Sequence, residues 1–130
     1  MFKANGKLVY DNKKRRAIVL VDDGIARFYR ALVPKSQRWL KPKYHTHITV
    51  VRTGVEKVSD DLWGYGDGMD IEFSYDPYVW IGKVYIYLDI YSKDIEKVRE
   101  NLGLPRLRIP HPSMTEARNC FHVTIANMKF

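Results

Sequence analysis

The sequence predicts an α+β domain whose sheet is largely antiparallel. Three observations support this class. Apolar runs typical of strands outnumber helical patterns, neighbouring strands are joined by short turns, and 130 residues suffice for one hydrophobic core. The chain has no internal repeat, low-complexity tract or linker. We therefore expect a single domain over residues 1–130.

The first expected element is a hairpin, and the second is open to two interpretations. KLVY (7–10) and RAIVLV (16–21) flank turn residues, as in a short hairpin. The segment GIARFYRALV (24–33) fits a strand in its RFYRALV part, but its apolar residues also recur at helical spacing. These residues are Ile25, Phe28, Tyr29 and Leu32. Pro34 ends the element in either case.

The middle of the chain is expected to alternate between loops and strands. Residues 36–43 are basic and predict a loop or short helix, HTHITVVR (45–52) predicts a strand, and the glycine-rich residues 54–69 predict a loop. MDIEFSYD (69–76) predicts a strand. VWIGKVYIYLDIY (79–91) predicts one long strand with a bulge at Gly82.

One helix and one strand are expected in the last third of the chain. Ser92 is typical of a helix N-cap, and Gly103 followed by a proline ends the helix. Its apolar stripe consists of Ile95, Val98 and Leu102. Residues 106–119 predict a loop, and FHVTIANM (121–128) predicts the last strand.

The charge favours an anionic partner. Twenty-two Lys and Arg against 15 Asp and Glu give a formal net charge of +7, which suits RNA, DNA, nucleotides or acidic surfaces, although solubility alone also explains it. Basic residues gather in KKRR (13–16) and around the strand 45–52. The second group consists of Lys35, Arg38, Lys41, Lys43 and Arg52.

A cytoplasmic, soluble location is expected. The single Cys120 excludes an intramolecular disulfide and a cysteine-based zinc cluster, which fits a reducing compartment. No apolar run approaches membrane-spanning length, and the first twelve residues lack the apolar core of a signal peptide. We therefore expect no membrane partner.

Two strands carry the same polar pattern. Because side chains alternate along a strand, His47 and Thr49 share one face, and His122 and Thr124 share the corresponding face of the last strand. One such strand is usually only a solvated face. Two copies favour a site. If the two halves of the chain fold as similar lobes, the two pairs would face each other across a cleft.

Paired histidines and threonines suit phosphodiester cleavage without a metal. An imidazole has an ordinary pKa of roughly 6.5, so one copy can accept a proton while the other donates one near neutral pH. One histidine would deprotonate water or a ribose 2′-hydroxyl, and the other would protonate the leaving oxygen. The hydroxyls of Thr49 and Thr124 would stabilise the charge on the non-bridging oxygens.

The motifs resemble those of a known superfamily. His47-Ile48-Thr49-Val50 and His122-Val123-Thr124-Ile125 are similar to the paired His-x-Thr-apolar motifs of the two-histidine (2H) phosphoesterases, the LigT-like proteins. The resemblance implies a bilobal α+β fold with two antiparallel sheets lining a central cleft and helices outside. It also implies a metal-independent hydrolase with His47, Thr49, His122 and Thr124 as catalytic residues and no cofactor.

The same resemblance implies nucleotide substrates. Known members include RNA 2′,3′-cyclic phosphodiesterases, oligonucleotide-trimming enzymes and phage anti-CBASS nucleases that cut cyclic oligonucleotide signals. The reduced loops are similar to those of phage proteins, which would place this one in the host cytoplasm. The expected partner is a nucleotide, cyclic oligonucleotide or short RNA. The alternative is a non-catalytic nucleotide- or RNA-binding module on the same fold.

Further residues are candidates for binding the substrate. Three aromatic residues offer rings on which a base could stack, and three basic residues could bind phosphates. These candidates are Tyr10, Trp39 and Tyr44, and Lys35, Arg38 and Arg52. On residues 84–91, one face carries Tyr85, Tyr87, Asp89 and Tyr91, and we expect it to line the groove.

A metal site is the alternative use of the histidines. It would combine His45, His47, His111 and His122. We do not favour it, because no carboxylates accompany these histidines and the threonines would have no role. No metal is therefore expected.

Overall fold

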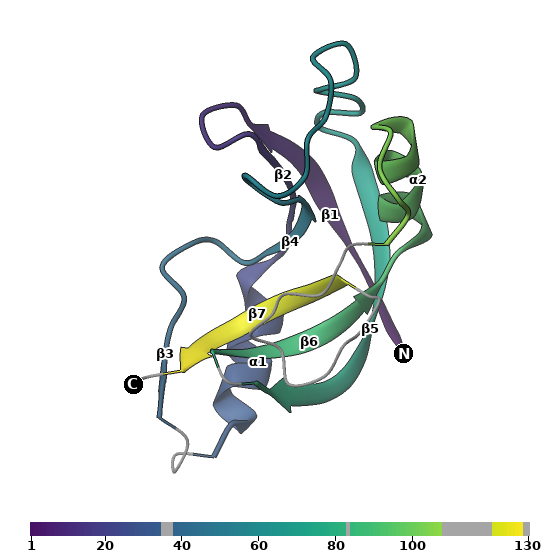
Figure 1. Cartoon of the computed structure of the whole chain (residues 1–130). Coiled ribbons are helices and arrows are strands. Elements are labelled where there is room, and N and C mark those ends of the chain that lie inside the picture. The colour runs from purple at the N-terminus through teal and green to yellow at the C-terminus, as the bar shows by residue number, and fades with distance from the viewer. Residues whose placement is uncertain (35–37, 83, 108–120, 129–130) are drawn as a thin grey trace.

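The computed structural model describes residues 1–34, 38–82, 84–107 and 121–128. Within these residues it is mostly β, with seven strands and two short helices (Figure 1). In chain order the elements are β1 (Phe2–Asp11), β2 (Arg16–Leu20), α1 (Asp23–Leu32), β3 (Trp39–Leu40), β4 (His47–Val51), β5 (Asp70–Ile81), β6 (Tyr85–Tyr91), α2 (Lys93–Asn101) and β7 (Phe121–Met128).

Six of these strands close into an antiparallel barrel. The order around it is β7-β4-β2-β1-β5-β6, and β6 pairs back onto β7 to complete the ring. The short strand β3 also pairs with β7, beyond the end of β4. Closure removes the open sheet edges that would otherwise expose unpaired backbone groups.

The expectation of a bilobal α+β fold with two sheets lining a central cleft is wrong. The strand β7 pairs with β4 on one side and with β6 on the other, so both halves of the chain contribute to one continuous sheet. Both halves also share one hydrophobic core. A two-lobed arrangement would need two separate sheets, and this pairing leaves none.

The barrel interior holds the core, and the motif residues lie on the outer face. Ile48 and Val50 of β4 and Val123 and Ile125 of β7 are completely buried in the core. Because side chains alternate along a strand, the neighbouring His and Thr residues point away from it. The apolar face expected to pack under a helix therefore packs inside a barrel.

The first hairpin is confirmed. β1 and β2 pair from Lys7 opposite Leu20 to Asp11 opposite Arg16. The carboxylate of Asp11 accepts hydrogen bonds from the backbone N–H groups of Lys13 and Lys14, at 3.1 and 3.2 Å, and so closes the turn. Such local side-chain-to-backbone bonds are the reason aspartate favours turns.

The ambiguous segment 24–33 is helical, but its buried face differs from the expected stripe. Phe28 and Leu32 are 61% and 62% exposed, whereas Ala26, Tyr29 and Arg30 are buried. The guanidinium of Arg30 donates a hydrogen bond to the carbonyl of Ile125 on β7, at 3.1 Å. A pattern of apolar residues alone could not reveal this face, because an arginine is part of it.

The long strand expected over 79–91 is also wrong. β5 continues to Ile81, and the chain then reverses so that β6 pairs antiparallel to β5. The backbone N–H of Gly82 donates to the carbonyl of Tyr85, at 2.8 Å, so Gly82 belongs to the reversal and forms no bulge. The irregularity in pairing lies instead between Tyr75 and Val79.

The helix after residue 92 is confirmed with its cap and its stripe. The hydroxyl of Ser92 accepts from the backbone N–H of Ile95 at 3.1 Å, and Ile95, Val98 and Leu102 are buried. α2 lies beside β5 and also contacts β4, and its three apolar residues join the core of the barrel (Figure 1). Gly103 follows in a left-handed conformation (φ +80°) that favours glycine.

Two expected loops are only partly described. In the segment 36–43, expected to be a loop or short helix, Trp39 and Leu40 form the short strand β3. Of the loop expected over 106–119, residues 108–119 lie outside the described residues. No helix in the described ranges has the length and apolar character that crossing a membrane requires.

Candidate functional site

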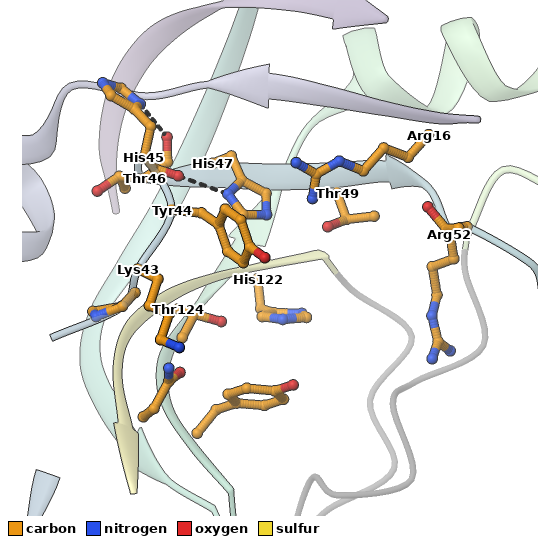
Figure 2. A pocket seen from close by; sticks show the side chains of 14 residues that line it. Arg16, Lys43, Tyr44, His45, Thr46, His47, Thr49, Arg52, His122 and Thr124 are labelled. Carbon is orange, nitrogen blue, oxygen red and sulfur yellow. Dashed lines mark hydrogen bonds between the residues drawn. The ribbon is translucent and has the colours of Figure 1, made fainter. Parts of the chain in front are cut away.

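The two His-x-Thr motifs lie on neighbouring strands of the barrel. Ile48 of β4 is paired with Val123 of β7, so the residues that flank them point outward side by side. His47, Thr49, His122 and Thr124 all line one pocket of about 370 Å³ (Figure 2). The structure thus brings the four residues together on one surface, whereas the sequence suggested two lobes facing across a cleft.

The ring of His47 is held in one tautomer by the chain just before it. Its Nδ1 lies 2.7 Å from the carbonyl oxygen of His45, as the dashed line in Figure 2 shows. A carbonyl can only accept, so Nδ1–H is the donor, and Nε2 remains as the nitrogen that can take up a proton. This geometry is suited to a general base.

Burial keeps His47 neutral. Removal from solvent is the main cause that lowers the pKa of its imidazole below the ordinary value, and the nearby charges of Arg16 and His45 lower it further. The hydrogen bond to the His45 carbonyl opposes this shift. Because desolvation penalises the charged form, His47 carries no proton on Nε2 near neutral pH.

Asp23 anchors the segment that holds His47. Its carboxylate accepts from both the backbone N–H (3.1 Å) and the hydroxyl (2.6 Å) of Thr46, and its second oxygen lies 3.6 Å from Nε2 of His45. The bonds from Thr46 lower the pKa of Asp23, so the anchor stays ionised. The first residue of α1 therefore fixes the backbone whose carbonyl orients the His47 ring.

His122 lies beside the outer face of β6. Its ring contacts that of Tyr87 edge-on, with centroids 5.8 Å apart and planes at 70°. In the β6–β7 register, Asp89 is opposite His122 and Tyr87 is opposite Thr124. Of the four residues of 84–91 that we expected to line the groove, Tyr85 lines the pocket, whereas Tyr87, Asp89 and Tyr91 do not. Tyr87 and Asp89 are buried next to the second motif.

Cationic side chains surround the pocket. Arg16, Lys43 and Arg52 line it together with the motif residues (Figure 2). Arg16 is the first residue of β2, and its guanidinium carbon lies 5.7 Å from the ring centre of Tyr44. The site therefore has the charge expected of one that binds phosphate.

The structure places the predicted substrate-binding residues in different locations. Tyr44 and Arg52 line the pocket, and Nζ of Lys14 lies 4.7 Å from the Tyr44 ring centre. Tyr10, Arg38 and Trp39 do not line it, and Lys35 lies outside the described residues.

Tyr10 and Trp39 are engaged elsewhere. The hydroxyl of Tyr10 donates to the carbonyl of Tyr65 at 2.7 Å, and its ring packs edge-on against Trp63. Trp39 is half-buried in β3, packed against the core.

The chain matches no protein-family model, no curated protein and no solved structure. The resemblance to the 2H phosphoesterases therefore remains a prediction from the two His-x-Thr motifs of the sequence.

Several lining residues were missed by reasoning from the sequence. Arg16 belongs to the basic run 13–16, which indicated an anionic partner. Only the pairing of β2 with β4 shows that Arg16 reaches the site. The remaining ones lie at strand ends or in connections and carried no signal. They are Pro42, Thr46, Thr53 and Asn127.

The four-histidine metal site is only partly described. His45, His47 and His122 all line the pocket, but His111 lies outside the described residues. In the described part of the chain, no three side chains of the His, Cys, Asp or Glu type are grouped so that they could hold a metal ion.

Proposed function

We propose that this protein is a metal-independent phosphodiesterase that cleaves phosphodiester bonds of nucleotides, by hydrolysis where water is the nucleophile and by transesterification where a ribose 2′-hydroxyl is. The observation that carries the proposal is the meeting of both His-Thr pairs in one pocket with three cationic side chains. Two titratable imidazoles and two hydroxyls supply proton transfer and hydrogen-bond donors. The cations attract the phosphate.

In the proposed reaction, His47 is the general base and His122 is the general acid. Nε2 of His47 takes a proton from water or from a ribose 2′-hydroxyl, whose oxygen then forms a bond to phosphorus. His122 gives a proton to the oxygen of the breaking P–O bond. The hydroxyls of Thr49 and Thr124 donate to the non-bridging oxygens, and solvent then returns both histidines to their starting states.

The pocket suits a small nucleotide or a short oligonucleotide. Its volume is within the range of about 300–1,000 Å³ typical of small-molecule sites. Tyr44 offers an exposed ring on which a base can stack, and Arg16, Lys43 and Arg52 are placed for the backbone phosphates. Cyclic oligonucleotides and 2′,3′-cyclic phosphates are the substrate classes that we propose.

Incubation with a panel of nucleotides in EDTA tests the proposed function. The panel comprises cyclic dinucleotides, cyclic trinucleotides, 2′,3′-cyclic nucleotides, and short 2′-5′ and 3′-5′ RNAs. We expect cleavage of at least one class at a rate within about twofold of that without EDTA, because side chains perform every step assigned above. Loss of the rate in EDTA and its recovery with zinc or manganese would replace this mechanism with a metal site.

The pH profile of kcat/KM is expected to be bell-shaped, with its acid limb below about pH 6.5. Burial and the Arg16 charge lower the pKa of His47, so this base stays active until the pH falls through its depressed value. Arg16→Gln should move the acid limb to higher pH, because it removes one cause of the shift. Lys7→Gln, which alters an exposed cation paired with Asp70, should leave the limb in place. A profile that is flat from pH 5 to 9 would rule out paired imidazoles.

A further inference from the structure

Asp89 is a buried acid on the outer face of β6, next to the site. The exposed fraction of Asp89 is 1%, although the core residues of β6 are Ile86, Leu88 and Ile90. Asp89 is the direct partner of His122 in the β6–β7 register. Directly opposed residues of an antiparallel pair share a face, and their Cβ atoms are about 4.5–5.5 Å apart.

The contact between Tyr87 and His122 supports the same placement independently. Tyr87 is two residues from Asp89, so both point to the outer face of β6. The edge-on contact of the Tyr87 and His122 rings shows that the imidazole points toward β6. His122 is therefore next to the stretch of β6 that carries the buried carboxylate.

The cationic side chains that line the pocket with His122 in the described part of the chain oppose its protonation. A general acid must carry its proton before the reaction, but positive charges nearby disfavour an imidazolium. On β6, the titratable neighbours of His122 besides Asp89 are Tyr85, which lines the pocket, and Tyr87, whose ring contacts the imidazole. Among the described residues, the titratable or cationic side chains that line the same pocket from other elements are Arg16, Lys43, Tyr44, His45, His47 and Arg52.

A buried carboxylate and an imidazolium can stabilise each other. Burying an ionised carboxylate is costly unless it is paired and hydrogen-bonded, and a carboxylate within about 4–6 Å favours the protonated form of a histidine. We infer that Asp89 is a positioning residue that orients the His122 ring and keeps it protonated as the general acid. This inference rests on the proposed function.

The pairing also explains how two similar motifs take opposite roles. The ring of His47 donates to a backbone carbonyl and is kept neutral, whereas His122 is opposite Asp89 in the strand register. The difference comes from the neighbours of each histidine, because the two His-x-Thr sequences are alike.

NMR titration of the histidine side chains tests this inference without relying on turnover. In the wild type, with the His122 signal assigned by its loss in His122→Ala, we expect a midpoint above that of His47 and above roughly 6.5, the value of an unperturbed imidazole. Asp89→Asn should lower the His122 midpoint by about one unit or more. The basic limb of kcat/KM should move to lower pH by the same amount, whereas the acid limb should stay in place. Asp70→Asn, an exposed acid on β5, is the matched control and should move neither limb.

A His122 midpoint below roughly 6.5 in the wild type would overturn the inference, even if Asp89→Asn failed to fold. An unchanged midpoint in a folded Asp89→Asn variant would also overturn it. If the midpoint moved as expected but the wild type cleaved no nucleotide, the pairing of Asp89 with His122 would stand. The proposed function would then be wrong.

Discussion

Replacing either His47 or His122 with alanine is expected to reduce the rate of phosphodiester cleavage by about 10²–10⁴-fold. Each substitution removes one of the two proton transfers. Affinity for the nucleotide should change by less than roughly tenfold, because binding depends mainly on the threonine hydroxyls, the Tyr44 ring and the cations around the pocket. Single-turnover rates and equilibrium binding, measured on the same preparations, separate the two effects.

The double variant His47→Ala/His122→Ala should be little slower than either single variant, because acid and base act as one unit and their losses do not add. His45→Ala is the matched control, since it removes an imidazole from the same pocket but keeps the backbone carbonyl that holds His47. Its rate should stay within about tenfold of the wild type, below the range for a general acid or base. Equal losses in all three single variants would contradict the assignment of roles.

Replacing Arg99 with methionine is expected to lower the free energy of unfolding by about 3–5 kcal/mol. Arg99 is completely buried on α2, and its guanidinium is bound by both carboxylate oxygens of Glu56, at 2.6 and 3.0 Å. It also donates to the carbonyls of Val50 and Pro105. The substitution leaves these acceptors without their donor and detaches α2 from β4.

Equilibrium unfolding in urea measures this loss. Lys97→Met is the matched control, because Lys97 is an exposed cation on the same helix and its replacement should change stability by no more than about 0.5 kcal/mol. Glu56 also accepts from the backbone N–H of Arg52, at 3.2 Å, so the network extends to a residue of the pocket. If Arg99→Met lowered the free energy of unfolding by less than about 1 kcal/mol, the contacts of Arg99 would not be what stabilises the packing of α2 on the barrel.

Local features were predictable because nearby residues determine them. The turn at Asp11, the cap at Ser92 and the alternation of His47 and Thr49 depend on short-range geometry, and the structure has each of them as expected. The reversal after Ile81 was missed because continuous β-forming residues on both sides of Gly82 concealed it.

The closure of the barrel was not predictable in the same way. It depends on β7 finding β6 and β4, which are distant in sequence, and the motifs alone fit two lobes as well as one barrel. Repetition of the His-x-Thr pattern still indicated that both pairs belong to one site.

Residues that support the motifs could be found only from strand pairing and packing. Arg16 reaches the pocket through the β2–β4 pairing, and Asp23 reaches it through its bonds to Thr46. Asp89 is next to His122 only because β6 is next to β7.

The most direct test of the central claim is a single-turnover experiment in EDTA with the nucleotide of the panel that binds most tightly. Wild type, His47→Ala and His122→Ala are each mixed in excess over this nucleotide, and both bound ligand and cleaved product are measured. We expect that all three proteins bind it and that only the wild type cleaves it at an appreciable rate. If the wild type bound the nucleotide and released it intact, the pocket would be that of a receptor, and the assignment as a phosphodiesterase would be wrong.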